Sequence, residues 1–558
     1  MLDLKNLKWS DLKPRFDDLI SAPLNADSMG EFLHRWSDLE KQLNESVNLA
    51  YRARTENTVD AEAAERYERL VTEVQPQAKA AAQALRDRVL SVPGYKPRDD
   101  ESDLFRRFAA QRDLYREANL PVETELALLA ARYDEIVGAM SVTLDGAILT
   151  MAAALQRLEN TVRVEREAAW REVMARFAQD RSALDELFLR MLPLRRQLAA
   201  NAGLSDYREF MWRAYGRFDY RPEDCLAFHA AIEAEIVPLA RKLLERRRVW
   251  LGLNELRPWD LDVDPLNRAP LRPFDTPEEL EAGVSRMMHQ LDPALGKDFD
   301  LLREGSLDLG SRANKAPGGY CEFFPVSGRP YIFMNAVGTH DDVNTLLHES
   351  GHSFHALASS RAHNLVWNHW SPMEFAEVGS MAMELLAAPY LEEGHGGFYG
   401  HEEAGRARAS HLEGAVLFLP YMAVVDAFQH WLYTTPEDVT PTSMDAQWTR
   451  LWERFMPVTD WSGLETQRAS GWQRKQHIFQ NPFYYVEYGL SQVGAFQVWR
   501  NSLSDAPAAL AAYRAALALG YTRPLPELYR AAGARLAFDR EMLASLRPLL
   551  EEHLGLAR

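Results

Sequence analysis

The chain has 558 residues, of which 47% are hydrophobic and 26% charged, so it has enough apolar side chains to bury a large core. Its 63 basic and 81 acidic side chains give a formal net charge of −18, which disfavours nucleic acid and anionic membrane surfaces as partners. Only two cysteines occur, Cys225 and Cys321, which excludes a disulfide framework or a cysteine-rich zinc ribbon and makes a reducing cytoplasm the expected localisation.

The N-terminal segment, residues 1–190, is predicted to form a lobe of packed helices. Charged residues are spread through its first twenty positions, so we expect no signal peptide. Apolar residues recur there at helical spacings of three and four, at Met29, Phe32, Trp36, Leu39, Leu43 and Val47, and again at Leu126, Leu129, Tyr133, Ile136 and Met140. A second region, residues 191–558, is expected to follow this lobe in a mainly α protein.

Between residues 250 and 340 proline and glycine become frequent, which predicts loops and short strands. Two aromatic-rich runs, 320–324 and 331–334, flank the turn residues 326–330 and predict a hairpin with a loop of about five or six residues. Helical patterns return after residue 341. The uncharged run 414–425 is shorter than the roughly 18 to 20 residues of a membrane span, so we expect a buried helix there.

The segment 348–352 has the HExxH pattern, with His348 and His352 four positions apart and Glu349 directly after the first histidine. Four residues advance a helix by about 400°, so both imidazoles lie on one face, close enough to share one metal ion. Thr339 and Asp342 have capping-box spacing and predict that a helix begins just before the motif. The alternative is a chance register of two core histidines and a surface glutamate.

A zinc ion needs a third protein ligand, and three glutamates follow the motif: Glu374, Glu377 and Glu384. Ser371 and Pro372 precede Glu374 as an N-cap residue and a first-turn proline, so we interpret Glu374 as a capping-box partner. Glu377 lies one turn further on, where it could face the motif across an antiparallel turn. We therefore predict that Glu377 joins the two histidines as the third ligand.

Two further residues are expected beside the ligands. Glu384 lies seven positions after Glu377, about 20° away on the same helical face, where it could accept a hydrogen bond from a ligand imidazole. A solvated or paired carboxylate fits equally well. His355 shares the face of the two motif histidines, but Ala358 stands where the metzincin pattern has its third histidine. We expect His355 to lie next to the ligands without binding the metal, with simple packing as the alternative.

These residues resemble the thimet oligopeptidase and oligoendopeptidase F family of zinc metallopeptidases. The resemblance rests on HESGHSFH at 348–355 and on Glu377 within FAEVGSMAMELL, 29 residues after His348. GGYCEFFPVSGRPYIFMN at 318–335 and HIFQNPFYYVEYGL at 477–490 are also similar to the family. The resemblance covers about residues 310–495. It implies a nearly all-helical, two-lobed body with a deep channel, a zinc ion at its floor, and cleavage of short peptides.

The block at 477–490 offers donors for a developing oxyanion. Tyr485 and Tyr488 are three positions apart on an expected helix, close to His477, and phenol donors facing a metal suit this role. An aromatic core stripe is the alternative, which the family resemblance disfavours. We choose Tyr485, Tyr488 and His477 as catalytic residues, and keep Tyr484 in reserve as a substrate-binding residue.

The block at 318–335 is expected to bind substrate. Gly318 and Gly319 permit a close approach of backbone, and Tyr320 begins the first predicted strand of the hairpin. An extended peptide can add to the edge of such a strand by main-chain hydrogen bonds. Short peptides are therefore the expected partners.

The resulting hypothesis is a zinc-dependent oligopeptidase that cleaves internal peptide bonds. His348, His352 and Glu377 would hold one Zn²⁺ per chain with one position open to water. Glu349 would take a proton from the attacking water and later pass it to the leaving amine. The nearest alternative is a zinc carboxypeptidase of the same helical superfamily. A noncatalytic helical peptide-binding protein is the second alternative, and the sequence leaves the oligomeric state open.

Overall fold

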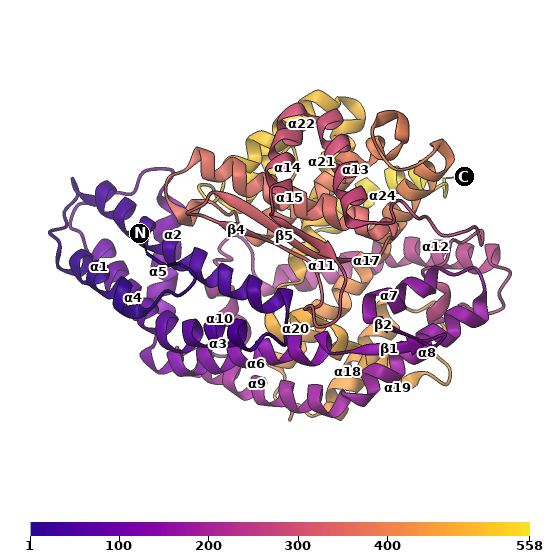
Figure 1. Cartoon of the computed structure of the whole chain (residues 1–558), viewed down its shortest axis with the longest axis horizontal. Helices are drawn as coiled ribbons and strands as arrows, with labels where there is room; N and C mark the ends of the chain where they lie inside the picture. The colour runs from indigo at the N-terminus through magenta and orange to yellow at the C-terminus, as the bar shows by residue number, and fades with distance from the viewer. Residues whose placement is uncertain (1, 558) are drawn as a thin grey trace.

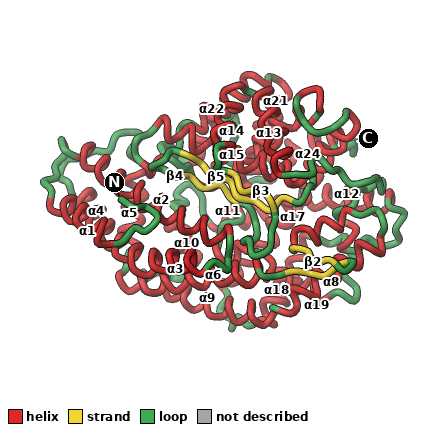
Figure 2. The backbone as a smooth tube through the Cα atoms, in the orientation of Figure 1, coloured by secondary structure: helices red, strands yellow, loops and turns green. Residues whose placement is uncertain are grey.

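The computed structural model describes residues 2–557 and is shown in Figure 1. Helices make up most of the molecule and two small sheets accompany them, as the colours of Figure 2 show. The larger sheet crosses the middle of this view, with helices grouped above and below it. The mainly α body that the sequence predicts is confirmed.

The helices before the larger sheet fall into two groups along the chain. The first group builds the end of the molecule that contains the N-terminus in Figure 1: α1 (Trp9–Ser21), α2 (Met29–Glu56), α3 (Ala61–Arg69), α4 (Gln75–Leu90) and α5 (Ser102–Leu114). The second group continues to the sheet: α6 (Leu120–Gly138), α7 (Met151–Leu155), α8 (Arg163–Gln179), α9 (Arg181–Asn201), α10 (Tyr207–Ala214), α11 (Pro222–Glu235), α12 (Val237–Trp250), α13 (Pro277–Leu291) and α14 (Pro293–Arg303).

Ten more helices follow the sheet and carry most of the predicted site residues: α15 (His340–Ala362), α16 (Met373–Ala387), α17 (His401–Thr434), α18 (Pro441–Phe455), α19 (Glu465–Ala469), α20 (Gln476–Gln480), α21 (Val486–Ser504), α22 (Ala506–Leu517), α23 (Leu525–Ala531) and α24 (Arg540–His553). Helix α16 packs against both α15 and α21. These three helices therefore form the framework of the site.

A β-hairpin interrupts the helices of residues 2–190, and the sequence analysis did not predict it. Strands β1 (Ser141–Leu144) and β2 (Ala147–Thr150) pair antiparallel around Asp145 and Gly146. Both turn residues have positive φ, 52° and 79°. A type I′ turn requires this conformation at both central positions, and Asp-Gly is one of its preferred pairs. The Asp145–Gly146 dipeptide is therefore the feature of the sequence from which this hairpin could have been predicted.

The predicted hairpin at 320–334 is confirmed with a shorter loop. Strand β4 (Tyr320–Phe324) pairs antiparallel with β5 (Arg329–Ala336), and Gly328 closes the turn with φ 67°. The loop is shorter than predicted because β5 begins at Arg329, ahead of the expected start. Strand β3 (Leu307–Gly310) pairs in parallel with β5, which gives the order β3-β5-β4. Strand β4 is therefore an edge strand of this sheet.

Buried apolar side chains form two main cores. One contains residues between 7 and 108 together with Leu365, and lies among α1, α2, α4 and α5. The larger one extends from Leu114 to Leu554 and includes side chains of α6 and α9. Helices α6 and α9 thus share a core with residues far beyond 190. The division of the chain at residue 190 stays a prediction.

Helix α17 includes the apolar run 414–425 that was expected to be a buried helix. Within residues 2–557 it is the helix that is long and apolar enough to cross a membrane by length and composition. It has 34 residues because the helix continues beyond the apolar run at both ends. Of its most apolar 18-residue window, 67% is buried inside the protein, as in a core helix.

Candidate metal centre and active site

Helix α15 carries the HExxH motif, and local chemistry fixes where this helix begins. The hydroxyl of Thr339 accepts a hydrogen bond from the backbone N–H of Asp342 at 3.3 Å, and the Asp342 carboxylate accepts from the N–H of Thr339 at 2.8 Å. This reciprocal capping box is the one that the sequence predicts. Two turns further on, the rings of His348 and His352 lie on one face with their centroids 5.0 Å apart.

Helix α16 crosses α15 very closely at Gly351. A Cβ atom at this position would lie 2.6 Å from Cα of Ser380 and 2.7 Å from the carbonyl oxygen of Gly379, closer than real Cβ atoms approach. Glycine at the fourth position of the HExxH motif is therefore required by the crossing. The close contact brings the carboxylate of Glu377 up to the two histidines.

The three predicted ligands meet at one point. Nε2 of His348 and Nε2 of His352 lie 3.2 Å and 3.3 Å from the same carboxylate oxygen, Oε2 of Glu377. One donor atom from each residue lies within 4.8 Å of the other two. Two imidazoles and one carboxylate form a donor set that Zn²⁺ takes in sites with an open fourth position. The residues present therefore fit a zinc ion.

The carboxylate of Glu377 is held by two hydroxyl groups. Tyr484 donates a hydrogen bond to Oε1 at 2.6 Å, and Ser380 donates to Oε2 at 3.0 Å. Burial by itself raises the pKa of Glu377, but His352 and His348 outweigh burial and hold it well below the usual range. The group is therefore anionic, as a metal ligand must be. Ser380 follows Glu377 by three positions, a spacing that the sequence analysis did not use.

Glu384 lies where the sequence analysis expects it. Its Oε1 is 2.7 Å from Nδ1 of His348, a geometry in which Nδ1–H donates to the carboxylate and Nε2 is the atom that would bind a metal. Its Oε2 is 2.6 Å from Nε2 of His411 on α17. The carboxylate thus bridges two histidines. His411 carries no local signal in the sequence, because it lies on another helix and meets Glu384 only in the folded chain.

Glu349 is 6% exposed, and its carboxylate lies close to Gly319, directly before β4. A Cβ atom on Gly319 would lie 3.6 Å from Oε1 of Glu349, so the glycine leaves open the space beside this carboxylate. Within the described residues, Oε2 of Glu349 has no hydrogen-bond partner. Burial raises the pKa of the Glu349 carboxyl. A carboxylate with a raised pKa and a free oxygen is equipped to accept a proton.

The interpretation of Glu374 as a capping-box partner is wrong. Helix α16 begins at Met373 with Pro372 at the N-cap, and Ser371 makes no capping bond to it. Glu374 instead points into the core, where Tyr220 donates a hydrogen bond to its carboxylate at 2.5 Å and Arg217 lies 3.3 Å away. Both partners come from the segment before α11, which explains why local sequence could not identify them.

The aromatic residues of the block 477–490 separate into three different environments. The hydroxyl of Tyr488 lies 3.1 Å from Nε2 of His477, and both residues face the site. Burial and the charge of Lys475 lower the pKa of His477 to about 3, so its ring is neutral. Tyr484 lines the smaller cavity and donates a hydrogen bond to Glu377, so its role in binding substrate stays a prediction.

Tyr485 lines the larger cavity beside His477, as predicted, but it does not lie on the predicted helix. Helix α21 begins at Val486, and Tyr485 precedes it with φ −159° and ψ −36°, outside the helical region. Its ring is 2% exposed, packs against Phe418 and Tyr421, and its hydroxyl pairs with Lys475. The helical spacing assumed for Tyr485 and Tyr488 is therefore absent, and their hydroxyls have different partners.

The predicted substrate residues lie along the edge strand β4 and before it. Gly318 has φ 87°, a conformation that favours glycine, and a Cβ there would lie 3.0 Å from Oε1 of Gln476. The hydroxyl of Tyr320 is 2.6 Å from Oγ1 of Thr55, and its ring stacks on Phe333. Tyr320 therefore fastens β4 to α2 rather than pointing at the metal ligands.

His355 is fully buried on α15, and its ring packs edge-on against Phe375 of α16. Neither ring nitrogen has a hydrogen-bond partner within residues 2–557. Burial, together with the neighbouring His352, lowers the pKa of His355 to about 3. The ring is neutral and contacts its neighbours by packing, the alternative that the sequence analysis left open.

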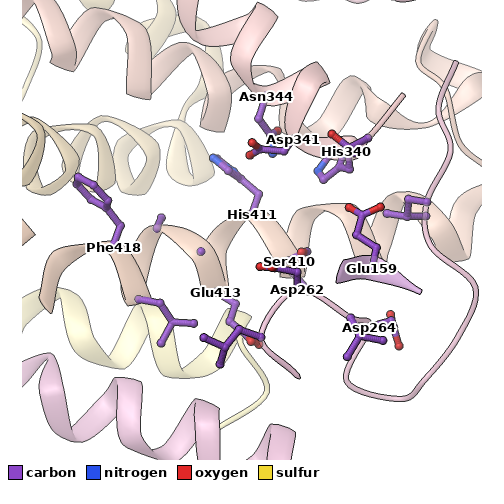
Figure 3. A pocket seen from close by; sticks show the side chains of 18 of the residues that line it. Glu159, Asp262, Asp264, His340, Asp341, Asn344, Ser410, His411, Glu413 and Phe418 are labelled. Atoms are coloured by element: carbon purple, nitrogen blue, oxygen red, sulfur yellow. The ribbon is translucent and has the colours of Figure 1, made fainter. Parts of the chain in front are cut away.

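Two cavities meet at the site. The smaller, about 670 Å³, is lined by the three predicted ligands and by Glu349, and extends toward α2 and α6. The larger, about 1420 Å³, extends past α17 to the acidic side chains labelled in Figure 3, among them Asp262 and Asp341. Gly319, His477 and Tyr488 line both cavities. The site therefore has open space on both sides.

Solved structures similar to this chain share its whole architecture. A structure titled "PZ peptidase A with inhibitor 2" superposes with a TM-score of 0.93 at 26% identity and covers 98% of both chains. A structure titled as a putative oligoendopeptidase F superposes with a TM-score of 0.94 at 27% identity, covering 99% of this chain and 97% of the other. The fold is therefore that of these peptidase structures over nearly its full length.

The helical body, together with an HExxH helix whose two histidines meet a glutamate from the next helix, is typical of a class of mainly helical peptidases. The family model described as "Peptidase family M3" matches residues 157–548. The chain belongs to peptidase family M3. A curated relative, "Oligoendopeptidase F homolog" of Lactococcus lactis subsp. lactis, is 24% identical over 267 residues, which is 45% of this chain and 41% of the relative. The aligned region thus spans less than half the length of that relative.

Proposed function

We propose that this protein is a zinc-dependent oligopeptidase that hydrolyses internal peptide bonds of short, unfolded peptides. His348, His352 and Glu377 would hold one Zn²⁺ per chain, a proposal supported by the convergence of their donor atoms. A bound zinc ion supplies Lewis acidity and activates water at neutral pH. Membership of peptidase family M3 supports the peptidase activity.

Glu349 is the proposed general base. Its carboxylate is adjacent to the ligand histidines in sequence, and burial raises its pKa, which makes it a better proton acceptor than an exposed glutamate. It would take the proton of the attacking water and deliver it to the leaving amine. The open space beside Gly319 leaves room for the scissile carbonyl next to this carboxylate.

Tyr488 is the proposed main oxyanion donor, with His477 as its partner. The hydroxyl of Tyr488 and Nε2 of His477 lie 3.1 Å apart at the junction of the two cavities. Neutral donors in a buried site can stabilise charge that develops in the transition state. Tyr484 acts differently: its hydrogen bond to Glu377 would orient the ligand carboxylate.

The proposal of internal cleavage rests on the open space on both sides of the site. A peptide bond held beside Glu349 could extend into the 1420 Å³ cavity on one side and the 670 Å³ cavity on the other. The free edge of β4 could pair with the extended backbone between them. A carboxypeptidase needs to close one side around the terminal carboxylate, so the geometry favours an endopeptidase.

One experiment tests the metal, the base and the reaction together. Zinc content and hydrolysis of an internally quenched peptide would be measured for the wild type and for Glu349→Gln, with and without a chelator. We expect about one zinc at this site in both proteins, and chelator-sensitive cleavage only in the wild type. Comparable turnover by Glu349→Gln would refute the assignment of the base. Loss of all cleavage with no zinc at this site would leave the noncatalytic peptide-binding protein.

A second experiment separates the two enzymatic candidates. Mass spectra of products from a peptide amidated at its C-terminus should show internal fragments, because an endopeptidase does not need the free carboxylate. Removal of single residues from free C-termini, with no cut in the amidated peptide, would favour the carboxypeptidase.

Both cysteines are free thiols, which supports the cytoplasm as the proposed compartment.

A further inference from the structure

A second group of metal-binding side chains lies in the core between α11 and α17, apart from the candidate active site. It consists of Cys225 and His229 on α11 and Asp426 and His430 on α17. In each helix the two residues are four positions apart and so share one face. The two helices pack against each other. Relative exposures are 0%, 3%, 0% and 4%, and none of the four residues lines either of the two cavities.

The geometry of this group repeats that of the candidate active site. Nε2 of His229 lies 2.8 Å and Nε2 of His430 lies 3.3 Å from the same oxygen, Oδ2 of Asp426. Donor atoms of Cys225, Asp426 and His430 all lie within 4.8 Å of one another. Ligand atoms of a tetrahedral zinc site are about 3.3 to 3.8 Å apart, given bond lengths of about 2.0 to 2.3 Å. Cys225, Asp426 and His430 are thus close to the arrangement that one ion requires, and His229 adjoins them through Asp426.

Two buried atoms of the group lack partners among the described residues. They are Oδ1 of Asp426 and Nε2 of His430, which makes no well-oriented hydrogen bond to Asp426. Buried polar atoms almost always have a hydrogen-bond or metal partner, so a partner is expected for these two. In a metal-free network the imidazole of His229 donates to Oδ2 of Asp426, Arg208 donates to Nδ1 of His430 at 3.3 Å, and the thiol has no role. That network leaves both atoms unpaired.

We propose that Cys225, His229, Asp426 and His430 bind a structural Zn²⁺ ion that ties α11 to α17. One thiolate and two imidazoles favour zinc over magnesium or calcium, and four protein ligands close the tetrahedron with no position left for water. With Nε2 of His430 on the metal, its Nδ1 carries the proton, and the partly exposed Arg208 side chain turns away from it. This proposal does not depend on the peptidase activity.

The deciding protein is the double variant His348→Ala/His352→Ala, which leaves the α11–α17 cluster untouched. After expression in zinc-supplemented medium and removal of loosely bound metal, its zinc content would be measured by elemental analysis. We expect about one zinc per chain in this variant and one more in the wild type. One zinc in the double variant supports the structural site whatever the candidate active site binds. No zinc in the double variant overturns it.

Substitution of cobalt for zinc tests whether Cys225 is a ligand of this site. The double variant expressed in cobalt-supplemented medium should show a thiolate-to-cobalt charge-transfer absorption in the near ultraviolet, because Cys225 would be bound to the metal. Adding Cys225→Ser should remove the absorption, whereas Cys321→Ser, at the other cysteine of the chain, should keep it. If Cys225→Ser fails to fold, the double variant still decides, since absence of the absorption there contradicts the proposal.

Discussion

Two places in this molecule bring two imidazoles onto one carboxylate oxygen, and they differ in access. At the α15–α16 crossing, the side chains of His348 and His352 are 19% and 12% exposed and line the smaller cavity. Between α11 and α17, the side chains of His229 and His430 are 3% and 5% exposed and reach no cavity. We therefore expect access to solvent to decide whether such donor atoms serve a reaction or hold helices together.

The largest expected effects come from a matched pair of isosteric changes. Glu377→Gln should abolish peptide hydrolysis and lower the free energy of unfolding less than the Asp426 change, because a neutral amide is a poor ligand at a site whose histidines are partly exposed. Asp426→Asn should lower the free energy of unfolding by about 3–5 kcal/mol, because it breaks a buried charged network. Peptide hydrolysis, zinc content and denaturant unfolding would measure both.

The contrast between the two sites fails if these outcomes are exchanged. A Glu377→Gln protein that unfolds readily would mean that the open site also stabilises the fold. An Asp426→Asn protein of normal stability that loses turnover would mean that the buried cluster takes part in catalysis.

Tyr488→Phe should reduce kcat by about 10²–10³-fold, because it removes a donor to the developing oxyanion. Tyr485→Phe is the matched control, since its hydroxyl pairs with Lys475 and its ring packs in the core. It should change kcat far less. Steady-state kinetics with zinc content held equal would compare them. A larger loss for Tyr485→Phe would reverse the assignment of the two phenols.

Glu384→Gln should weaken zinc binding at the open site by about 10–100-fold, because the amide no longer bridges His348 and His411 as an acceptor on both sides. Competition with a chelator of known affinity would measure the change. Glu402→Gln is the control, because the Glu402 side chain is 85% exposed. Equal metal affinity in both variants would show that the bridge does not tune the site.

Gly351→Ala should destabilise the protein by about 1–3 kcal/mol, because the new Cβ would overlap the backbone of α16 at Ser380 and push the two helices apart. Gly414→Ala on α17 meets no atom within 4 Å and should stabilise its helix by about 0.5–1 kcal/mol. Denaturant unfolding would measure both. A neutral Gly351→Ala would mean that the crossing of α15 and α16 can relax without cost.

Local features of the site were predictable because they depend on residues a few positions apart. The capping box of Thr339 and Asp342, the shared face of His348 and His352, and the hairpin of β4 and β5 all follow from short-range spacing. Glu377 could be selected from three glutamates because its place on α16 faces the motif. The Asp145–Gly146 turn had the same kind of local signal and was overlooked.

Other features depended on packing between distant segments. Tyr485 and Tyr488 look equivalent in the sequence, but α21 begins only at Val486, so their hydroxyls diverge. Glu374 fits a capping box in the sequence, yet Arg217 and Tyr220 draw it into the core. Neither outcome could be read locally, because the partners lie more than 150 residues away or depend on where a helix starts.

The sequence by itself determined the helical class of this protein, the motif helix and its candidate zinc ligands, because helical periodicity and the i, i+4 spacing are local properties of the chain. Only the tertiary structure decided which phenol pairs with His477, that His411 joins Glu384, and that cavities open on both sides of the site. It also brought Cys225 next to Asp426 across some 200 residues. Such contacts arise from packing of whole helices, which no short stretch of sequence encodes.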